Sequence, residues 1–371
     1  MTDWIEQNGG QNSVATRLAP VVRSLLKEAG YPLVRYIPAG ETAAAASFSV
    51  DATTASSFVE LIGQLKAAKP SDRPVTSVMV NGIGTFIARS AGTKSQGKRL
   101  HGKIALVTGA AQGFGEGIAR ELAAAGAHLV IADLNLEQAQ IVADSLNTDF
   151  GESAARALKV DVGSEESVQT LMETIALELG GLDLLVSNAG VLRAGGLEEM
   201  TLANFDFVTK INYTAFFLVT KYGSRMMKQQ AAVDPDYSAD IVQINSKSGL
   251  EGSNKNFAYA GGKFGGIGLV QSFAKELVDD RIKVNAICPG NYYEGPLWSD
   301  PERGLFVQYL NAGKVPGAKT VQDVYDFYVA KVPMRRGCSP RDVAKAILYC
   351  VEQDYETGQA IPVTGGQNML K

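Results

Sequence analysis

The run IALVTGAAQGFG, residues 104–115, decides the fold of this chain. Its first five residues form a short apolar stretch, which favours a buried strand. The glycines that follow permit a tight turn and a close approach of the backbone to a pyrophosphate, and the helical run ELAAAGA comes next. Because the N-terminus of a helix favours an anion, this order of strand, turn and helix predicts a dinucleotide site. Its predicted members are Gly109, Gln112, Gly113, Phe114 and Gly115.

A second predicted strand, His128–Ala132, ends at an acidic residue, Asp133. The carboxylate can accept hydrogen bonds from the ribose hydroxyls of an adenosine, and it would repel the additional phosphate of NADP. No arginine stands beside Asp133 to compensate for that repulsion. We therefore predict NAD as the cofactor, with Asp133 and Leu134 among the residues that bind it.

The stretch IVQINSKSGLEGSNKNFAYAGGKFGGIGLVQSF, residues 241–273, carries the predicted chemistry. A buried strand precedes Ser246, and a helix then carries Tyr259 and Lys263 at positions i and i+4 on one face. Tyrosine has a pKa of about 10 and is a poor base near neutrality, but a lysine ammonium one turn away would lower that pKa. The Ser246 hydroxyl could hold a substrate oxygen against the phenol, which predicts an acid–base site for an alcohol. Taken alone, such a Tyr–Lys pair is more often a solvated helix face.

These residues resemble the active site of the short-chain dehydrogenase/reductase family, with the serine thirteen residues before the tyrosine. The resemblance implies that Asn212 is the fourth catalytic residue, that it kinks its helix and that it helps to hold a water linked to Lys263. The family's NNAG element is present with Ser187 in place of its first asparagine. By the same resemblance, the remaining cofactor-binding residues are Asp161, Val162, Asn188, Ala189, Gly190, Pro289, Gly290 and Asn291, together with Tyr259 and Lys263.

From Lys103 onward, predicted strands alternate with helices, which is typical of an α/β protein with a doubly wound parallel sheet, a Rossmann fold. We assign residues 101–371 to the NAD-binding catalytic domain. Within it we expect a strand at 158–162, one long helix at 202–229, and a substrate lid at 292–334, where the chain is rich in aromatic residues, proline and glycine.

Residues 1–100 do not show the regular alternation of strands and helices found from Lys103 onward, and they are predicted to form a small α+β accessory module. We expect helices at 14–29 and 52–67, a strand at 32–37, and a hairpin from 75–80 and 85–88. The segment VMVNGIGTFIAR resembles the junction of fusions between class II sugar-phosphate aldolases and short-chain dehydrogenases. The module has none of the histidines on which that aldolase chemistry relies, so an oligomer-building or lid-like structural role is predicted.

Composition argues against several classes of function. A net charge of −4 gives no electrostatic reason to expect nucleic acid or an anionic membrane as a partner. The only histidines, His101 and His128, cannot form a histidine cluster for zinc, and no metal is predicted. Three widely separated cysteines indicate a reducing cytoplasm, and each is expected to be a small buried side chain. No signal peptide and no apolar run of membrane-spanning length are recognised.

Local segments indicate a substrate. QINSKSG, AYAGGKFGGIGLVQS, KVPMRRGC and TGQAIPVTGGQNM resemble the branch of the family that oxidises sorbitol 6-phosphate to fructose 6-phosphate with NAD. A phosphosugar needs cations in its pocket, where arginine can bind phosphate oxygens bidentately and lysine acts as a point charge. Arg193 and Lys247 are the candidate phosphate ligands, and Lys255 and Arg335 are weaker candidates. Glu294 is expected near the lid, where its carboxylate would disfavour phosphate. A dehydrogenase of an unphosphorylated polyol or a sugar acid therefore stays open.

Two further hypotheses come from other classes. One is a non-catalytic scaffold that binds a dinucleotide, against which the complete set of Asn, Ser, Tyr and Lys argues. The other is a reductase of lipid or acyl-carrier substrates, for which the polar, glycine-rich surroundings give little support. The family resemblance also implies a homotetramer built through the long helices around Asn212 and Tyr259.

Overall fold

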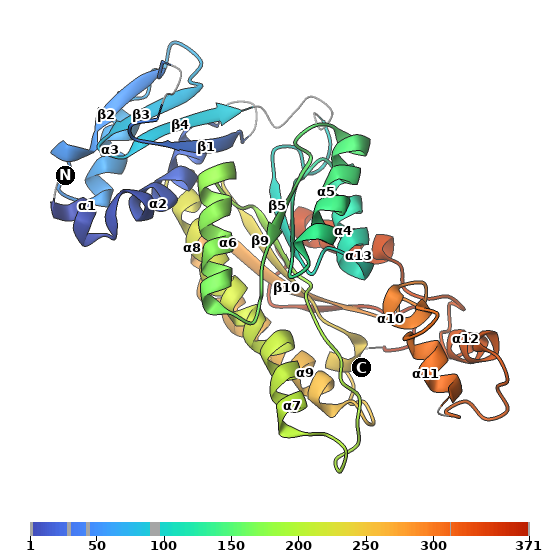
Figure 1. Cartoon of the computed structure of the whole chain (residues 1–371). Helices are drawn as coiled ribbons and strands as arrows, with labels where there is room; N and C mark the ends of the chain where they lie inside the picture. Colours follow the sequence, from blue (N-terminus) through green and yellow to red (C-terminus); the bar gives the residue numbers. More distant parts are fainter. Residues whose placement is uncertain (1–2, 28–30, 42–44, 90–96, 312, 370–371) are drawn as a thin grey trace.

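The computed structural model describes residues 3–27, 31–41, 45–89, 97–311 and 313–369. It contains two β-sheets in different parts of the molecule (Figure 1). The chain up to Arg89 forms a mixed four-stranded sheet with its helices, and the chain from Ile104 forms a parallel seven-stranded sheet with helices on both faces. The predicted fold class, a doubly wound α/β sheet with a small α+β part before it, is confirmed.

The N-terminal part holds three helices and four strands, and all of them except α1 and β2 were predicted from the sequence. They are α1 (Asp3–Gln7), α2 (Gly10–Leu25), β1 (Leu33–Pro38), β2 (Phe48–Asp51), α3 (Phe58–Ala68), β3 (Ser77–Asn81) and β4 (Gly84–Arg89). The predicted hairpin is present, because β3 and β4 are antiparallel and Gly82 between them has a φ of +86°. The four-residue strand β2 was missed, and it pairs with β3 in parallel.

The large sheet has the strand order β11-β10-β9-β8-β5-β6-β7, with every neighbouring pair parallel. Its strands are β5 (Ile104–Thr108), β6 (His128–Asp133), β7 (Ala155–Lys159), β8 (Leu184–Ser187), β9 (Ala239–Ile244), β10 (Ile282–Pro289) and β11 (Ala360–Val363). The order reverses between β5 and β8, and ligands of such sheets bind at the carboxyl ends of the strands beside that point. The predicted motifs all follow these carboxyl ends.

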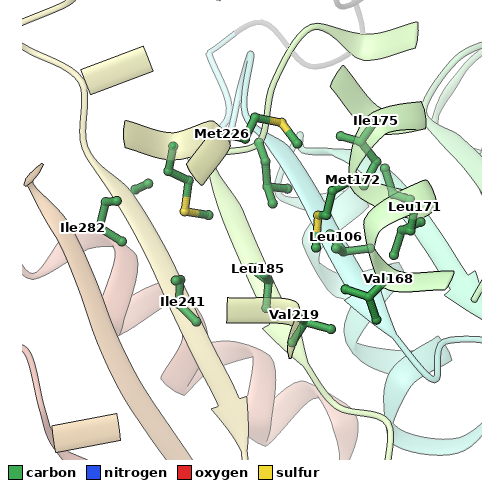
Figure 2. Packing of buried hydrophobic residues seen from close by; sticks show 14 of the residues in the cluster. Leu106, Val168, Leu171, Met172, Ile175, Leu185, Val219, Met226, Ile241 and Ile282 are labelled. Atoms are coloured by element: carbon green, nitrogen blue, oxygen red, sulfur yellow. The ribbon is translucent and has the colours of Figure 1, made fainter. Parts of the chain in front are cut away.

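Helices bury both faces of this sheet. They are α4 (Gly113–Ala124), α5 (Leu136–Phe150), α6 (Glu165–Leu179), α7 (Leu202–Thr209), α8 (Ala215–Ala231), α9 (Phe257–Leu277) and α13 (Pro340–Glu352). One core lies between the sheet and α6, α8 and α9, and the other lies against α4, α5 and α13. Figure 2 shows the first core, where strand residues meet helix residues, among them Leu106, Leu185, Ile241, Met172 and Met226.

Two elements differ from the sequence prediction. The strand expected at 158–162 lies at Ala155–Lys159, since Asp161 accepts a hydrogen bond from the backbone N–H of Gly163 (2.9 Å) and turns the chain. The long helix expected at 202–229 is interrupted by a π-helical turn, Lys210–Thr214, between α7 and α8. Asn212 lies inside this turn, where the resemblance implied a kink.

The segment 292–334 has an apolar core of its own. It contains the short helices α10 (Pro296–Ser299), α11 (Leu305–Asn311) and α12 (Val321–Ala330), drawn in orange in Figure 1. Buried rings of Tyr293, Trp298 and Phe306 lie at its centre. The segment therefore packs as a unit around aromatic side chains rather than as an irregular loop.

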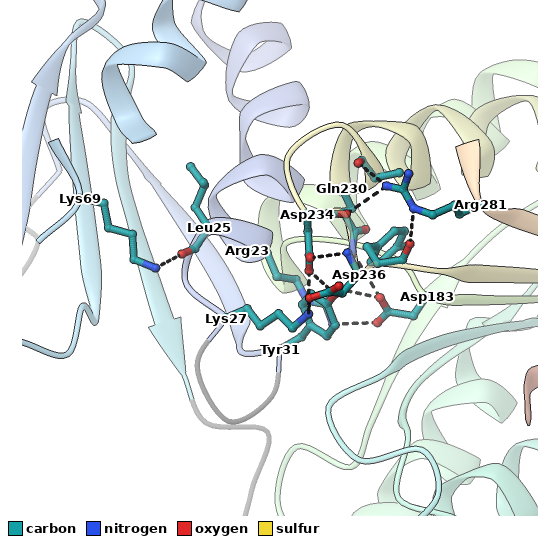
Figure 3. Close-up of polar contacts among 12 residues, drawn as sticks. Arg23, Leu25, Lys27, Tyr31, Lys69, Asp183, Gln230, Asp234, Asp236 and Arg281 are labelled. Carbon is teal, nitrogen blue, oxygen red and sulfur yellow. Dashed lines mark hydrogen bonds and ion pairs between the residues drawn. The ribbon is translucent and has the colours of Figure 1, made fainter. Parts of the chain in front are cut away.

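A buried ion pair joins the N-terminal part to the large sheet (Figure 3). Arg23 on α2 and Asp183, directly before β8, are 0% and 1% exposed, and Nη2 of Arg23 lies 2.7 Å from Oδ2 of Asp183. The guanidinium also donates to the carbonyl oxygens of Pro32 and Gly102. The carboxylate also accepts the backbone N–H of Ile104, at 2.7 Å. Both buried charges are thus fully hydrogen-bonded, which a buried pair requires.

A second polar contact lies beside this ion pair. Asp234, which follows α8, accepts hydrogen bonds from Lys27 (3.0 Å) and from the Tyr31 hydroxyl. Burial raises the pKa of the Tyr31 phenol, and the hydrogen bond to Asp234 raises it further. The two parts of the chain are therefore in close polar contact. Their division into domains at residues 100 and 101 stays a prediction.

His128, at the start of β6, is expected to make the folded protein less stable in acid. Burial lowers the pKa of His128 from 6.5 to about 4. The unfolded chain therefore binds a proton more readily than the folded chain, and stability should fall by up to about 3 kcal/mol as the pH drops from 6.5 to 4. In urea unfolding, His128→Val should lose less stability on acidification than the wild type does. An equal loss in both proteins would contradict this assignment.

Three further findings concern the described residues. No helix among them is long and apolar enough to cross a membrane. No group of three or more His, Cys, Asp or Glu side chains in the same residues could hold a metal ion. All three cysteines, Cys288, Cys338 and Cys350, are buried, as predicted.

Candidate active site

The predicted chemical residues meet at the carboxyl end of β9. Ser246 follows this strand by two positions and begins a short 3-10 turn, where its Oγ accepts the backbone N–H of Ser248 (3.1 Å). Tyr259 and Lys263 lie on the first two turns of α9. Asn245, which sequence reasoning missed, donates its amide to the backbone carbonyl of Lys263 (2.9 Å). This bond ties the end of the strand to the helix that carries the tyrosine.

The electrostatics of Tyr259 differ from the expectation. Burial raises the pKa of the Tyr259 phenol, and only the hydrogen bond with the Ser246 hydroxyl lowers it. Lys263 is not among the causes of this shift, and burial lowers the pKa of Lys263 itself to about 8. Its Nζ lies 5.5 Å from the centroid of the Tyr259 ring and donates to the carbonyl oxygen of Ile244 (2.8 Å). The prediction of a phenol made acidic by its lysine is therefore wrong for the chain alone.

Asn212 lies next to this group. Its side chain is buried and makes two hydrogen bonds to the backbone of Val191, accepting the N–H (3.0 Å) and donating to the carbonyl (2.7 Å). A Cβ on Gly190 would lie 2.9 Å from Oδ1 of Asn212 and 3.9 Å from Nζ of Lys263. The π-helical turn thus brings Asn212, Gly190 and Lys263 together. The amide of Asn212 positions the loop that follows β8.

The glycine turn after β5 has the form expected for a pyrophosphate site. Gly109 has a φ of +64°, and a Cβ on Gly115 would lie 2.1 Å from the carbonyl oxygen of Gly109, so α4 approaches the turn closely only without a side chain there. Gln112 precedes α4 and makes no side-chain hydrogen bond to its first N–H groups. These groups are therefore available to an anion, and the turn fits the pyrophosphate of a dinucleotide. Phe114 lies in the first turn of α4.

Asn188 and Ala189 support this turn from β8. The Asn188 amide donates to the carbonyl oxygens of Thr108 (2.9 Å) and Gly109 (3.1 Å). The Thr108 hydroxyl accepts the backbone N–H groups of both residues, each at 3.1 Å. A Cβ on Gly109 would lie 2.8 Å from Cα of Ala189. The element resembling NNAG thus shapes the turn, and Thr108 is a supporting residue that the sequence analysis did not name.

The acidic residues predicted at the adenosine end lie at loop starts. Asp133 accepts the backbone N–H groups of Ala111 and Asn135, each at 3.0 Å. Leu134 beside it is exposed. Asp161 is exposed and makes the turn described above, while the Val162 side chain is buried in the core. Asp133, Leu134 and Asp161 are thus open to a ligand, whereas Val162 could offer only its backbone.

The segment Pro289–Asn291 is held between the last strand and residue 338. Gly290 donates to the carbonyl of Val363 (2.9 Å), and the carbonyl of Asn291 accepts the N–H of Cys338 (2.8 Å). Directly after it, the ring of Tyr292 lies 5.0 Å from that of Phe114. A cavity of about 410 Å³ borders Gly290 and Asn291 on the side of α13, but Ser246 and Tyr259 do not line it. It lies beside the predicted chemistry rather than over it.

In the part of the chain that the structure describes, no hydrogen bond or ion pair joins Arg193, Lys247 and Glu294 to one another. Arg193 is exposed and lies over the ring of Phe207 at 5.3 Å. The carboxylate of Glu294 lies near Gly337, where an added Cβ would be 3.0 Å from Oε2. Both weaker candidates, Lys255 and Arg335, have positive φ values, of 56° and 55°, and Arg335 donates to the carbonyl of Ala330.

Lys247 has the environment best suited to an anion. It is half-buried beside Ser246, and burial lowers the pKa of its ammonium, with Lys331 acting in the same direction and Glu251 opposing them. Among the residues that the structure describes, no hydrogen bond or ion pair is made by its ammonium. A partly desolvated cation that forms no ion pair favours an anionic group brought close to it.

Comparison with known proteins agrees with this geometry. Residues 103–298 match the family described as short chain dehydrogenase. The sorbitol-6-phosphate 2-dehydrogenase of Escherichia coli K12 is 36% identical over 270 residues, which are 72% of this chain and 99% of that protein. The D-threitol dehydrogenase of Mycolicibacterium smegmatis is 36% identical over 192 residues, 52% of this chain and 70% of that protein. The crystal structure of sorbitol-6-phosphate 2-dehydrogenase SrlD from Erwinia amylovora has 37% identity and a TM-score of 0.66, and the match covers 72% of this chain and 100% of that one.

The chain belongs to the short-chain dehydrogenase family and is an oxidoreductase of that family. Members of the family use NAD or NADP and act on small molecules. The relatives named above are similar in sequence to this chain, and two of them carry the name of a sorbitol-6-phosphate dehydrogenase.

Proposed function

We propose that the chain is an NAD-dependent dehydrogenase that interconverts a secondary alcohol of a polyol or sugar phosphate and the ketone. Sorbitol 6-phosphate and fructose 6-phosphate are the first candidate pair. The observation that carries the proposal is the meeting of Ser246, Tyr259 and Lys263 at the carboxyl end of β9, next to Gly190. The identity of 36% to a sorbitol-6-phosphate dehydrogenase over nearly all of that protein supports the substrate class.

Each residue has a distinct proposed role in alcohol oxidation. Tyr259 accepts the hydroxyl proton as general base, and Ser246 hydrogen-bonds the substrate oxygen and holds it against the phenol. Oxidised nicotinamide supplies the hydride acceptor and a positive charge that favours the phenolate. Lys263 binds the nicotinamide ribose and adds charge below its pKa of about 8. Asn212 positions the loop after β8 and supports the path by which the proton reaches solvent.

Asp133 is the proposed reason for a preference for NAD over NADP. The sequence from Gly109 to Gly115 and from Asp133 to Gln138 contains no arginine or lysine that could pair with an additional phosphate. Asp133→Asn keeps the size of the side chain and removes its charge. We expect the ratio of NADP to NAD affinity to rise by about tenfold, equivalent to about 1.4 kcal/mol.

Titration with both reduced cofactors, followed by their fluorescence, measures this ratio. Asp279→Asn, at an exposed position in the 3-10 turn Val278–Asp280 that follows α9, serves as the matched control and should leave the ratio unchanged. An unaltered preference in Asp133→Asn would exclude this carboxylate as the discriminating group.

Lys247 is the proposed ligand of the substrate's phosphate. Lys247→Gln should lower kcat/KM for sorbitol 6-phosphate by about tenfold or more, since a partly buried charged hydrogen bond contributes about 1.5–3 kcal/mol. It should change kcat/KM for sorbitol by much less. Lys275→Gln, an exposed lysine farther along α9, is the control.

A screen of sugar phosphates against their unphosphorylated counterparts, with NAD and NADP, tests the whole proposal. Turnover of sorbitol or another neutral polyol with none of the phosphate would favour the second candidate, which the likeness to D-threitol dehydrogenase and the carboxylate of Glu294 support. A sugar acid belongs to the same alternative. Binding of NAD without turnover of any alcohol would instead indicate a dinucleotide-binding scaffold.

We further propose a homo-oligomer, a tetramer by family resemblance. Phe217 on α8 and Phe264 on α9 are exposed large rings on the helices that the resemblance implies in the contacts. Light scattering of the purified protein measures its mass, and a monomer at micromolar concentration would exclude the proposal. The three unpaired cysteines support a reducing compartment such as the cytoplasm.

A further inference from the structure

Tyr292 connects two parts of the molecule that serve different ligands. Its ring packs on that of Phe114, with centroids 5.0 Å apart and planes inclined by 36°. Phe114 belongs to the first turn of α4, where the pyrophosphate is expected. Close by, a Cβ on Gly113 would meet only Pro296, at 3.8 Å. The start of the 292–334 segment therefore lies directly against the glycine turn at two points.

The next residue, Tyr293, packs into the aromatic core of the 292–334 segment instead of against the glycine turn. Its ring contacts those of Trp298 (5.0 Å) and Phe306 (5.8 Å), and its hydroxyl donates to the carbonyl of Tyr328 (3.1 Å). Tyr293 is buried at the centre of the aromatic core of the segment. Tyr292 thus contacts the glycine turn, and its neighbour Tyr293 contacts the aromatic core formed with α10 to α12.

We propose that Tyr292 is a positioning residue through which a dinucleotide bound at the glycine turn sets the position of the 292–334 segment over the substrate. This inference rests on the proposed function. The space beside Gly113 is bordered by Pro296, at 3.8 Å from an added Cβ, so a ligand at the N-terminus of α4 would lie next to Pro296 and the pair Phe114–Tyr292. Its interaction energy then differs between positions of the segment, which is the condition for a ligand to shift a conformation. Tyr293 transmits the shift because it is part of the aromatic core.

Gly295 offers a second way to test the same contact. A Cβ on Gly295 would lie 2.4 Å from Cδ1 of Tyr292, well inside van der Waals contact. Gly295→Ala should therefore displace the ring of Tyr292 from its position against Phe114 while the tyrosine itself is kept. Tyr292→Ala removes the ring, and Tyr292→Phe keeps the ring contact and removes only the hydroxyl.

Tryptophan fluorescence can report on the segment directly. The chain has two tryptophans, Trp4 in the N-terminal part and Trp298 in the aromatic core of the segment. In full-length Trp4→Phe protein, emission comes from Trp298 alone. Titration with NAD+ should change this emission with a saturation curve that matches the thermal shift produced by NAD+. Tyr292→Phe should retain the change, and Tyr292→Ala and Gly295→Ala should lose most of it.

Kinetics provide an independent readout. In Tyr292→Ala the KM for the polyol should rise about tenfold, while the Kd for NAD+ changes by less than about threefold. Tyr355→Ala, whose side chain is 97% exposed, should leave both constants unchanged. Emission and KM that remain at the Trp4→Phe values in Tyr292→Ala would overturn the proposal, as would NAD+ binding with no change of Trp298 emission. If neither NAD+ nor NADP+ shifts the melting temperature of the wild type, the proposed function itself fails.

Discussion

Replacing Tyr259 with phenylalanine is expected to lower kcat by about 10²–10⁴-fold and to leave the affinity for NADH within about threefold of the wild type. The substitution removes the only group within the cluster that we propose to accept the hydroxyl proton. It keeps the ring, which lies 5.5 Å from the ammonium of Lys263, so the packing that shapes the cofactor side is retained. Steady-state turnover of the best polyol and fluorescence titration with NADH measure the two quantities.

The pH dependence of the two reaction directions provides a further test of the role of Tyr259, and a substitution at an exposed tyrosine provides the control. Because burial raises the pKa of Tyr259, alcohol oxidation, which needs the phenolate, should become faster as the pH rises through neutrality. Ketone reduction needs the neutral phenol and should vary little over the same range. Tyr355→Phe, at an exposed position, should behave as the wild type. Turnover of Tyr259→Phe near the wild-type rate would remove Tyr259 from the mechanism.

Replacing Arg23 with methionine is expected to lower the free energy of unfolding by about 3–5 kcal/mol. The variant retains an apolar side chain of similar length but leaves the carboxylate of Asp183, 1% exposed, without its cation. The guanidinium makes hydrogen bonds to Pro32, Gly102 and Asp183 and lies 4.9 Å from the centroid of the Tyr31 ring, and methionine keeps only the apolar part of these contacts. Urea unfolding followed by circular dichroism measures the loss.

Two comparisons make this result specific. Arg23→Met combined with Asp183→Asn removes both charges and should be less destabilising than the two single losses added together. Arg120→Ala breaks an exposed pair with Asp149, whose side chains are 39% and 47% exposed, and should cost no more than about 1 kcal/mol. A loss in Arg23→Met as small as that in Arg120→Ala would show that the buried pair contributes little.

Most of the fold could be predicted from the sequence because its signals are local. The apolar run before Gly109, the glycine turn and the alternation of strands and helices are each encoded within a few neighbouring residues. The failures have other causes. β2 has four residues and pairs with a strand more than twenty positions away, so no local pattern marks it. The strand near residue 158 begins and ends earlier than predicted since Asp161 turns the chain.

In the candidate site, too, the features encoded by neighbouring residues could be predicted, and those that depend on the folded environment could not. The spacing of Ser246, Tyr259 and Lys263 could be predicted, and the structure brings these side chains together. The direction of the pKa shift of Tyr259 could not be predicted from the sequence. It depends on how deeply the phenol is buried and on the hydrogen bond that Lys263 donates to Ile244. The contact between Phe114 and Tyr292 joins residues far apart in the chain, and nothing near either of them in sequence marks it.

The ion pair at the amino ends of β5 and β8 limits how this protein can be rearranged. The match to the Escherichia coli enzyme accounts for 99% of that protein but only 72% of this chain, so that relative is about as long as the matched part of this chain. Cutting this chain back to that length would remove Arg23 and leave the carboxylate of Asp183 with only the backbone N–H of Ile104 and the amide of Gln230 as hydrogen-bond donors among the described residues. Grafting the N-terminal portion onto a shorter homologue would likewise demand an aspartate at the matching place, so the two portions can be exchanged only as a matched set.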